Sequence, residues 1–376
     1  MSLRAIVTLG VYASLVPLVG ATGTWTGPLS AAAFVDVQAP AADDTRALPI
    51  HAGQVERRDA GSGLQPAIEG ALRGTTDRLW IAWAVPAVSR PGGGWSDRSD
   101  GRCVLDDDGN FHDGNFDGST TTLIVLVRAT AGAIDRVAFT DGRCVVDAGS
   151  RRVIWLDHVA VQASARLLAD LVRRDAAGAS ASADDDRSNR AGRRALPALA
   201  LHDDPAVDAT LTEFVAAGEP DWLRRDAAFW LAVARGQAGA AVVERLARSD
   251  TDDRFREHLT FVLTLIASRG LDTLIDLARH DASSRVRGQA LFWIGQKAGE
   301  RATATLAHAV DDDPNADVRK KAVFAISQLP KDESVPTLIQ LAKTHRDPEV
   351  RRQAMFWLGQ SGDPRALAFF EAVLEK

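Results

Sequence analysis

The chain has 376 residues, of which 46% are apolar and 25% are charged, so it has the composition of a folded protein and the length of two domains. Its net charge is −6, and it contains no block rich in Lys and Arg. The basic surface that nucleic-acid binding requires is therefore not expected, and no nucleic-acid partner is predicted.

The first 21 residues have the pattern of a Sec signal peptide. Arg4 supplies the charged end, an apolar run covers residues 5–21, and Val19, Gly20 and Ala21 are small or apolar at the cleavage positions. The alternative is an uncleaved membrane anchor, although the run is slightly short for a spanning helix. We therefore expect an exported protein, periplasmic or extracellular, that contacts a membrane only if this segment is retained.

Residues 22–172 predict a small α+β domain with an antiparallel sheet, after a loose start that is rich in Ala, Pro, Thr and Asp. Its expected elements are a strand over residues 54–58, a helix over 64–72, a strand over 79–85, a meander over 120–127, 134–139 and 144–146, and a helix over 159–173. The strand over 79–85 is apolar throughout, which predicts burial on both faces.

The chain has only two cysteines, Cys103 and Cys144. In an exported protein a disulfide between them is the default interpretation. A role as metal ligands is the alternative, but no Cys-x-x-Cys spacing or paired histidine accompanies them.

A second candidate site lies in the Asp/Gly-rich loop that follows Cys103. The pattern Asp113-x-Asn115-x-Asp117 is the first half of a calcium loop. Ile124 stands where such a loop needs a bidentate Glu, so a solvated turn is favoured over a calcium site.

Residues 173–194 are poor in apolar side chains and dense in Ala, Ser and mixed charge. They predict a flexible linker to a second domain.

The rest of the chain is organised by an eleven-residue phrase that occurs five times. The copies are LRRDAAFWLAV, FREHLTFVLTL, VRGQALFWIGQ, VRKKAVFAISQ and VRRQAMFWLGQ, and their phenylalanines are 31 or 32 residues apart. Between the copies lies a second segment with apolar residues at helical spacing. Each unit therefore predicts two helices, and the units predict an all-α solenoid over residues 195–376.

The phrase resembles the HEAT-repeat family, in particular the short phycobilisome-lyase-type repeats. The resemblance rests on Val350, Arg351, Ala354, Leu358 and Gly359, and it covers roughly the last 180 residues. It implies an architecture and hardly any function. An exported domain followed by such an array is similar to exported bacterial HEAT-repeat proteins.

An arginine stands five residues before each phrase phenylalanine. These residues are Arg224, Arg256, Arg287, Arg319 and Arg351. The resemblance implies a structural role in which each guanidinium bonds carboxylates and carbonyls of the turns, and Asp221, Asp253, Asp317 and Glu349 are the expected partners. The alternative is a row of anion-binding groups, because Arg suits phosphate and carboxylate ligands.

The phrase phenylalanines fall on the polar side of their helices at 100° per residue. In the HEAT pattern this helix lines the concave surface, so the resemblance implies an aromatic row along a groove. The predicted partner-binding residues are Phe261, Phe292, Trp293, Gln296, Phe324, Phe356, Trp357 and Gln360. Two alternatives stay open: the rings pack between adjacent repeats, or the N-terminal domain docks on them.

The sequence shows no catalytic motif: no Gly-x-Ser-x-Gly, no phosphate-binding Gly-rich loop and no His-Glu-x-x-His. The HEAT-like enzyme deoxyhypusine hydroxylase holds iron through His-Glu pairs, and no His-Glu dipeptide occurs here. We therefore predict no catalytic residue and no cofactor. The favoured function is a scaffold that binds a protein or peptide; the alternative is an enzyme or calcium-dependent binding protein with its site in the N-terminal domain.

Overall fold

The computed structural model describes residues 48–73, 78–88, 102–105, 111–112, 121–142, 145–178, 191–296 and 300–375. The predicted signal peptide, the calcium loop at Asp113, Asn115 and Asp117, and Cys144 lie outside the described residues. The signal peptide, the calcium site and the disulfide between Cys103 and Cys144 therefore stay predictions.

The main sheet of the N-terminal region has five strands. In spatial order they are β2 (Gln54–Asp59), β9 (Arg152–Asp157), β3 (Leu79–Pro86), β6 (Thr122–Thr130) and β7 (Ala133–Asp141). The pairing of β6 with β7 is antiparallel, as predicted, and β3 also lies antiparallel to β6, whereas β9 lies parallel to both β2 and β3. The sheet is therefore mixed, because β9, which was not among the expected strands, inserts between β2 and β3.

A second, smaller sheet contains the strand that was expected to complete the meander. Its order is β1 (Ile50–His51), β8 (Val145–Asp147), β4 (Arg102–Leu105) and β5 (Phe111–His112). The prediction that residues 144–146 pair with β7 was wrong, since β8 lies parallel to β1 and β4. Val146 is fully buried in the core between the two sheets, which fixes β8 in this position.

Strand β3 is buried on both faces, which confirms the prediction for residues 79–85. Ile81 and Trp83 belong to the core formed with α1 (Leu64–Leu72) and α2 (Val161–Gly178). Trp80 and Ala82 belong to the core that faces the small sheet. The alternation follows from the twofold period of a strand.

The predicted flexible linker over residues 173–194 was wrong at both ends. Residues 173–178 continue α2, and residues 191–194 begin α3 (Ala191–Ala200). The two helices pack closely at Gly192, which has no side chain. A Cβ at this position would lie only 2.6 Å from the Leu171 carbonyl oxygen. Helix α3 also packs against β7, so residues 48–376 form one unit, in which the described strands contact α2 and α3.

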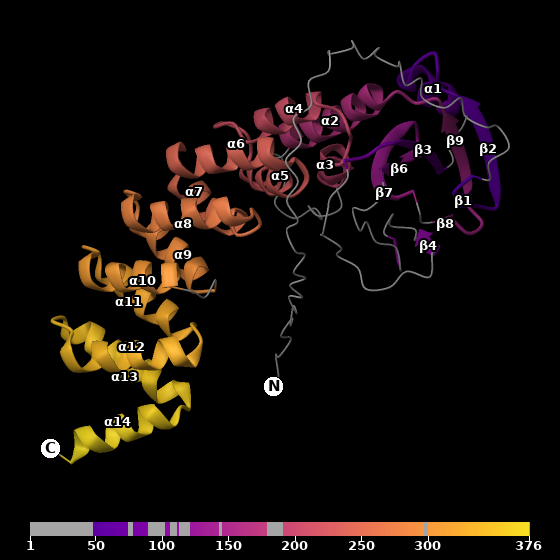
Figure 1. Ribbon diagram of the computed structural model, residues 1–376. Coiled ribbons are helices and arrows are strands. Elements are labelled where there is room, and N and C mark those ends of the chain that lie inside the picture. The colour runs from indigo at the N-terminus through magenta and orange to yellow at the C-terminus, as the bar shows by residue number, and fades with distance from the viewer. Residues whose placement is uncertain are drawn as a thin grey trace, which may run out of the picture. The chain divides into compact units, whose positions relative to one another are not determined.

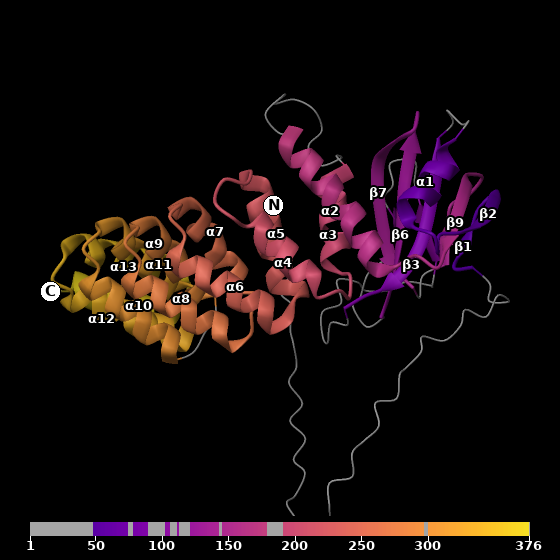
Figure 2. The same ribbon diagram turned by 90° about the horizontal axis from the view of Figure 1, so that it is seen from above.

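The C-terminal region is an α-solenoid of stacked helix pairs (Figure 1). After α4 (Ala206–Phe214) its helices are α5 (Asp221–Ala234), α6 (Gly236–Ser249), α7 (Asp253–Leu263), α8 (Ser268–His280), α9 (Ser284–Gly295), α10 (Glu300–Asp312), α11 (Ala316–Ser327), α12 (Lys331–Thr344), α13 (Pro348–Ser361) and α14 (Pro364–Leu374). We call α5, α7, α9, α11 and α13 the phrase helices, because each contains one copy of the phrase. The helices that alternate with them, α6, α8, α10, α12 and α14, are the spacer helices. Figure 2 shows phrase helices in one row and spacer helices in another.

The sequence explains where three of the phrase helices, α7, α11 and α13, begin. Asp252, Asn315 and Asp347 are N-caps whose side chains accept backbone N–H groups of the first turn. Pro348 follows Asp347 at the first helical position, where a missing N–H costs nothing. At Asp347 and Pro348 the turn thus stops one helix and starts the next.

Candidate binding surface

Four of the phrase helices, α5, α7, α9 and α11, carry an arginine whose guanidinium joins two consecutive turns, and we call this series of contacts the ladder. Nη1 of Arg256 donates to the Asp250 carbonyl oxygen at 2.6 Å, while its Nε and Nη2 donate to the Asp281 carboxylate at 2.9 Å each. Arg287 repeats this arrangement: Nη1 lies 2.9 Å from the Asp281 carbonyl oxygen, and Nε and Nη2 lie 2.7 and 3.0 Å from the carboxylate of Asp313. One aspartate therefore serves two arginines, by its carbonyl and by its carboxylate.

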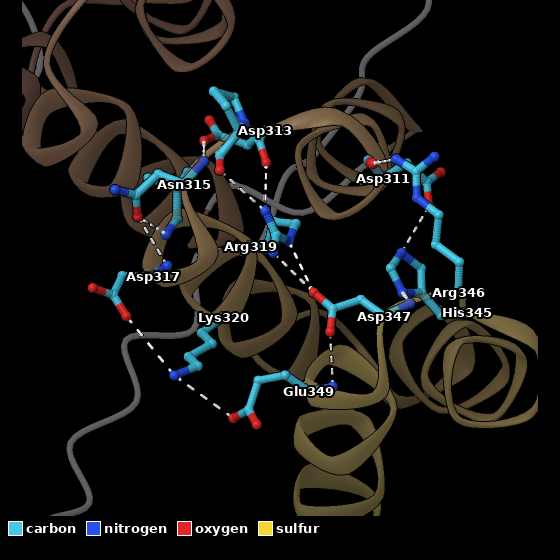
Figure 3. Close-up of polar contacts among 12 residues, drawn as sticks. Asp311, Asp313, Asn315, Asp317, Arg319, Lys320, His345, Arg346, Asp347 and Glu349 are labelled. Atoms are coloured by element: carbon cyan, nitrogen blue, oxygen red, sulfur yellow. Dashed lines mark hydrogen bonds and ion pairs between the residues drawn. The ribbon is translucent and has the colours of Figure 1, made fainter.

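The same ladder continues to Arg319, which donates to the Asp313 carbonyl oxygen and to the carboxylate of Asp347, both at 2.9 Å (Figure 3). At the other end, Nη2 of Arg224 lies 2.5 Å from the Asp250 carboxylate. Its guanidinium also lies over the Phe255 ring, 3.9 Å from the centroid.

Arg351 differs from the other four. Its Nη1 donates to the carbonyl oxygens of His345 and Arg346, and within the described part of the chain it pairs with no carboxylate. The four expected carboxylate partners were wrong. Asp221 pairs with Arg225, Asp253 accepts from Ser283, Asp317 lies near Lys320, and Glu349 pairs with Arg352.

The ladder leaves little capacity for an added anion. The hydrogen bond with Asp313 raises the pKa of Arg287 above its ordinary value, against the opposing effect of burial. Because Nε, Nη1 and Nη2 of Arg287 are all bonded within the protein, the geometry favours the structural role over the anion-binding alternative.

Six aromatic side chains on the phrase helices form one continuous chain of ring contacts, which we call the aromatic row. Its members are Phe261, Trp293, Phe292, Phe324, Trp357 and Phe356. Trp293 packs on Phe261 of the preceding repeat with centroids 5.4 Å apart, and Trp357 packs on Phe324 in the same way at 4.9 Å. The structure thus brings together all six predicted rings.

At the phrase position directly after the phenylalanine, large and small side chains alternate from one repeat to the next, and this lets the rings of the row pack between one another. Trp293 and Trp357 occupy it in α9 and α13, whereas Val262 and Ala325 occupy it in α7 and α11. Where Ala325 leaves space, Phe292 stacks on Phe324 with centroids 6.3 Å apart and planes at 8°. Packing between adjacent repeats is therefore part of the role of these rings.

Exposure differs along the row. Phe261, Phe292 and Phe324 are half-buried, but 54% of Phe356 is exposed. Gln296 and Gln360, the two predicted polar neighbours, are also exposed. The row therefore ends on α13 in a ring and an amide that are open to a partner.

A histidine borders the other end of the row. The His258 ring lies 6.3 Å from Phe261, and burial, followed by the nearby Arg225, lowers the pKa of His258. His258 was not predicted as a site residue, although it stands three residues before the phrase phenylalanine and so on the same side of the helix.

In the N-terminal region the structure reveals an exposed pair, His158 and Asp59, at the carboxyl ends of β9 and β2. His158 Nδ1 lies 2.7 Å from Asp59 Oδ1, and this hydrogen bond raises the pKa of His158. No pattern in the sequence links these residues, since 99 positions separate them. The described residues contain no group of three metal-ligating side chains.

Cys103 lies in β4 and is fully buried. Strand β8, which pairs with β4, begins at the residue after Cys144. The predicted disulfide would therefore join β4 to the residue that precedes β8. None of the helices in the described ranges combines the length and the apolar character needed to span a membrane.

Comparison with known proteins identifies the repeats. Residues 239–327, 271–344 and 303–376 match the family model for HEAT repeats. No curated protein matches the chain.

Solved structures of low identity are also similar. Human deoxyhypusine hydroxylase shares 15% identity over 57% of this chain and 74% of its own, with a TM-score of 0.25. The CpcE–CpcF complex of phycocyanin lyase from a Nostoc species shares 16% over 55% and 78%, with a TM-score of 0.29. Escherichia coli YibA shares 20% over 58% and 83%, with a TM-score of 0.33.

Proposed function

We propose that this protein, whose residues 239–376 are HEAT repeats, is an exported scaffold that binds a partner protein or peptide through the aromatic row. Arrays of this kind present extended surfaces on which neighbouring repeats contribute successive contacts. No catalytic step and no cofactor belong to the proposal.

The observation that carries the proposal is the exposure of Phe356 at the end of the row. A ring that is 54% exposed and backed by Trp357, at 4.9 Å, is held in place before a partner arrives. Such rings are favourable anchors, because little side-chain freedom remains to be lost on binding. Neighbouring helices lie about 8–10 Å apart, so the half-buried rings behind Phe356 offer further apolar contacts at regular intervals.

The exposed glutamines supply the polar part of the surface. Gln360 stands one helical turn beyond Phe356, and its amide both donates and accepts hydrogen bonds. A peptide that places an apolar side chain against Phe356 would therefore offer its backbone to Gln360. This combination favours an extended apolar segment as ligand.

Export is supported by the pattern of residues 1–21 and by the presence of only two cysteines, Cys103 and Cys144. Fractionation of cells that express the full chain, with N-terminal sequencing of the product, tests this part. A mature N-terminus near Thr22 in the periplasmic or secreted fraction is expected. Full-length protein in the cytoplasm would contradict it.

Selection from a random peptide library on the immobilised full chain tests the binding surface. Enriched peptides should share spaced apolar residues, and they should lose binding to the Phe356→Ser and Gln360→Ala variants. Leu265→Ser is the matched control, because Leu265 is an exposed apolar residue outside the row, 39% exposed. Equal loss with Leu265→Ser, or no loss with Phe356→Ser, would reject the aromatic row as the binding surface.

A further inference from the structure

One residue interrupts the regular pattern of the turns between repeats. In three consecutive turns an aspartate follows the spacer helix and accepts the backbone N–H two residues further on. The distances are 2.9 Å from Asp252 N to Asp250 Oδ1, 2.8 Å from Ser283 N to Asp281 Oδ1, and 2.9 Å from Asn315 N to Asp313 Oδ1. These bonds fix the shape of each turn.

In the fourth turn a histidine takes this place. His345 Nδ1 accepts the backbone N–H of Asp347 at 3.1 Å (Figure 3). His345 cannot also provide a carboxylate to the arginine of the previous repeat, and Asp347 binds Arg319 instead. The two tasks of one aspartate are thus divided between His345 and Asp347.

The hydrogen bond from Asp347 N determines which ring nitrogen of His345 carries the proton. A backbone N–H only donates, so Nδ1 of His345 must be unprotonated, and the proton of the neutral ring is on Nε2. His345 is buried, and its Nε2 lies 3.3 Å from Asp311 Oδ1 without a well-aligned hydrogen bond. A pocket of about 360 Å³ between α10 and α12, lined by Asp311, Thr337 and Gln340, borders the His345 ring, although Nε2 itself is shielded from solvent.

We propose that His345 makes the seating of the last helix pair, α13 and α14, sensitive to protons. A second proton on the ring can only go to Nδ1, where it faces the Asp347 N–H, so two donors oppose each other and the turn bond is lost. The ring, now cationic, is attracted to Asp311. At the turns formed by Asp250, Asp281 and Asp313 a carboxylate, and not an imidazole, accepts the corresponding N–H.

The charged groups around His345 come from every neighbouring element. Asp311 and Asp312 on α10 and Arg346 in the turn line the same pocket. Arg351 of α13 donates to the His345 carbonyl oxygen, and Arg319 of α11 reaches the turn through Asp347. Loss of the bond from Asp347 N therefore loosens the Arg319–Asp347 rung, which joins α11 to α13. This inference does not depend on the proposed function.

Nitrogen-15 NMR of the full chain tests the starting state. The His345 ring should show the form with the proton on Nε2 at about pH 8 and should take a second proton as the pH falls to about 5. A ring with its proton on Nδ1 at high pH would overturn the inference.

Hydrogen exchange tests the consequence. Protection factors, corrected for the intrinsic pH dependence of exchange, should fall about fivefold for the amides of Asp347, Glu349, Val350 and Arg351 between about pH 8 and about pH 5, since one turn bond is lost. His345→Asn keeps an acceptor that does not titrate, and His345→Asp restores the residue of the other turns. Both variants should abolish the fall.

The matched control is His308→Asn, because His308 is an exposed histidine of the adjacent helix α10 that pairs with Asp312 at 3.8 Å. This variant should keep the wild-type response. Protection that does not change with pH in the wild type, or that falls equally in His345→Asn, would reject a role for His345.

Discussion

Ser164 on α2 and His202 after α3 are hydrogen-bonded in the buried core, with Ser164 Oγ 2.7 Å from His202 Nε2. Trp83 Nε1 of β3 donates to Ser164 Oγ at 2.8 Å, and His202 Nδ1 lies 2.7 Å from the Ala198 carbonyl oxygen. Since that carbonyl can only accept, Nδ1 carries the proton and Ser164 donates to Nε2. The chain of bonds joins the sheet to the first helices of the array, and it requires a neutral histidine.

This requirement predicts acid sensitivity. Burial lowers the pKa of His202 from 6.5 to about 4, although the bond to Ala198 opposes the change. Below pH 6.5 the unfolded chain binds a proton that the folded chain does not, so the stabilisation is complete above pH 6.5 and is lost as the pH falls towards 4. The loss should reach roughly 3 kcal/mol of the free energy of unfolding.

Urea unfolding at pH 7 and at about pH 4 measures this loss. His202→Gln keeps one donor and one acceptor and cannot titrate, so its stability should depend less on pH than that of the wild type. The same pH dependence in both proteins would show that His202 does not contribute.

The ladder predicts unequal costs for two chemically identical substitutions. Arg287→Ala removes the partner of the buried Asp313 carboxylate and should lower the free energy of unfolding by about 3 kcal/mol. Arg351→Ala removes bonds to carbonyl oxygens only and should cost about 1 kcal/mol. Chemical denaturation of the two variants decides the matter, and equal costs would contradict the ladder.

Two glycines of the phrase predict opposite effects. A Cβ on Gly295 would lie 2.9 Å from the Cβ and the carbonyl oxygen of Ala325, whereas a Cβ on Gly359 meets nothing within 4 Å. Gly295→Ala should therefore destabilise the array by roughly 1–3 kcal/mol, and Gly359→Ala should stabilise it by up to about 1 kcal/mol. Thermal unfolding would refute this if both variants shifted in the same direction.

The disulfide prediction concerns Cys103 and Cys144. Thiol titration of the denatured, unreduced protein from an oxidising compartment should find no free thiol. Reduction should lower the free energy of unfolding by roughly 3–4 kcal/mol, because the bond closes a loop of about 40 residues. Two free thiols in that preparation would count against both the disulfide and export.

Much of the fold could be predicted from local periodic patterns in the sequence. The 31- or 32-residue spacing of the phrase determined the helix pairs of the array, and the apolar run over residues 79–85 determined that β3 is buried on both faces. The alignment of Phe261, Phe292, Phe324 and Phe356 also placed their rings on one row, because helices of equal repeat stack with equal faces together.

The tertiary structure decided what depends on distant contacts. Arg256 and Arg287 bind carboxylates 25 and 26 residues further along the chain, so proximity in sequence pointed to the wrong aspartates. Residues 173–178 are polar in composition, yet they continue a helix whose preceding turns, with Leu171 and Val172, are buried. Strand β9 and the bond between Ser164 and His202 likewise exist only where elements far apart in sequence meet. A sequence pattern encodes the periodicity of one element, whereas partners are chosen by the packing of several, and only the folded chain fixes that packing.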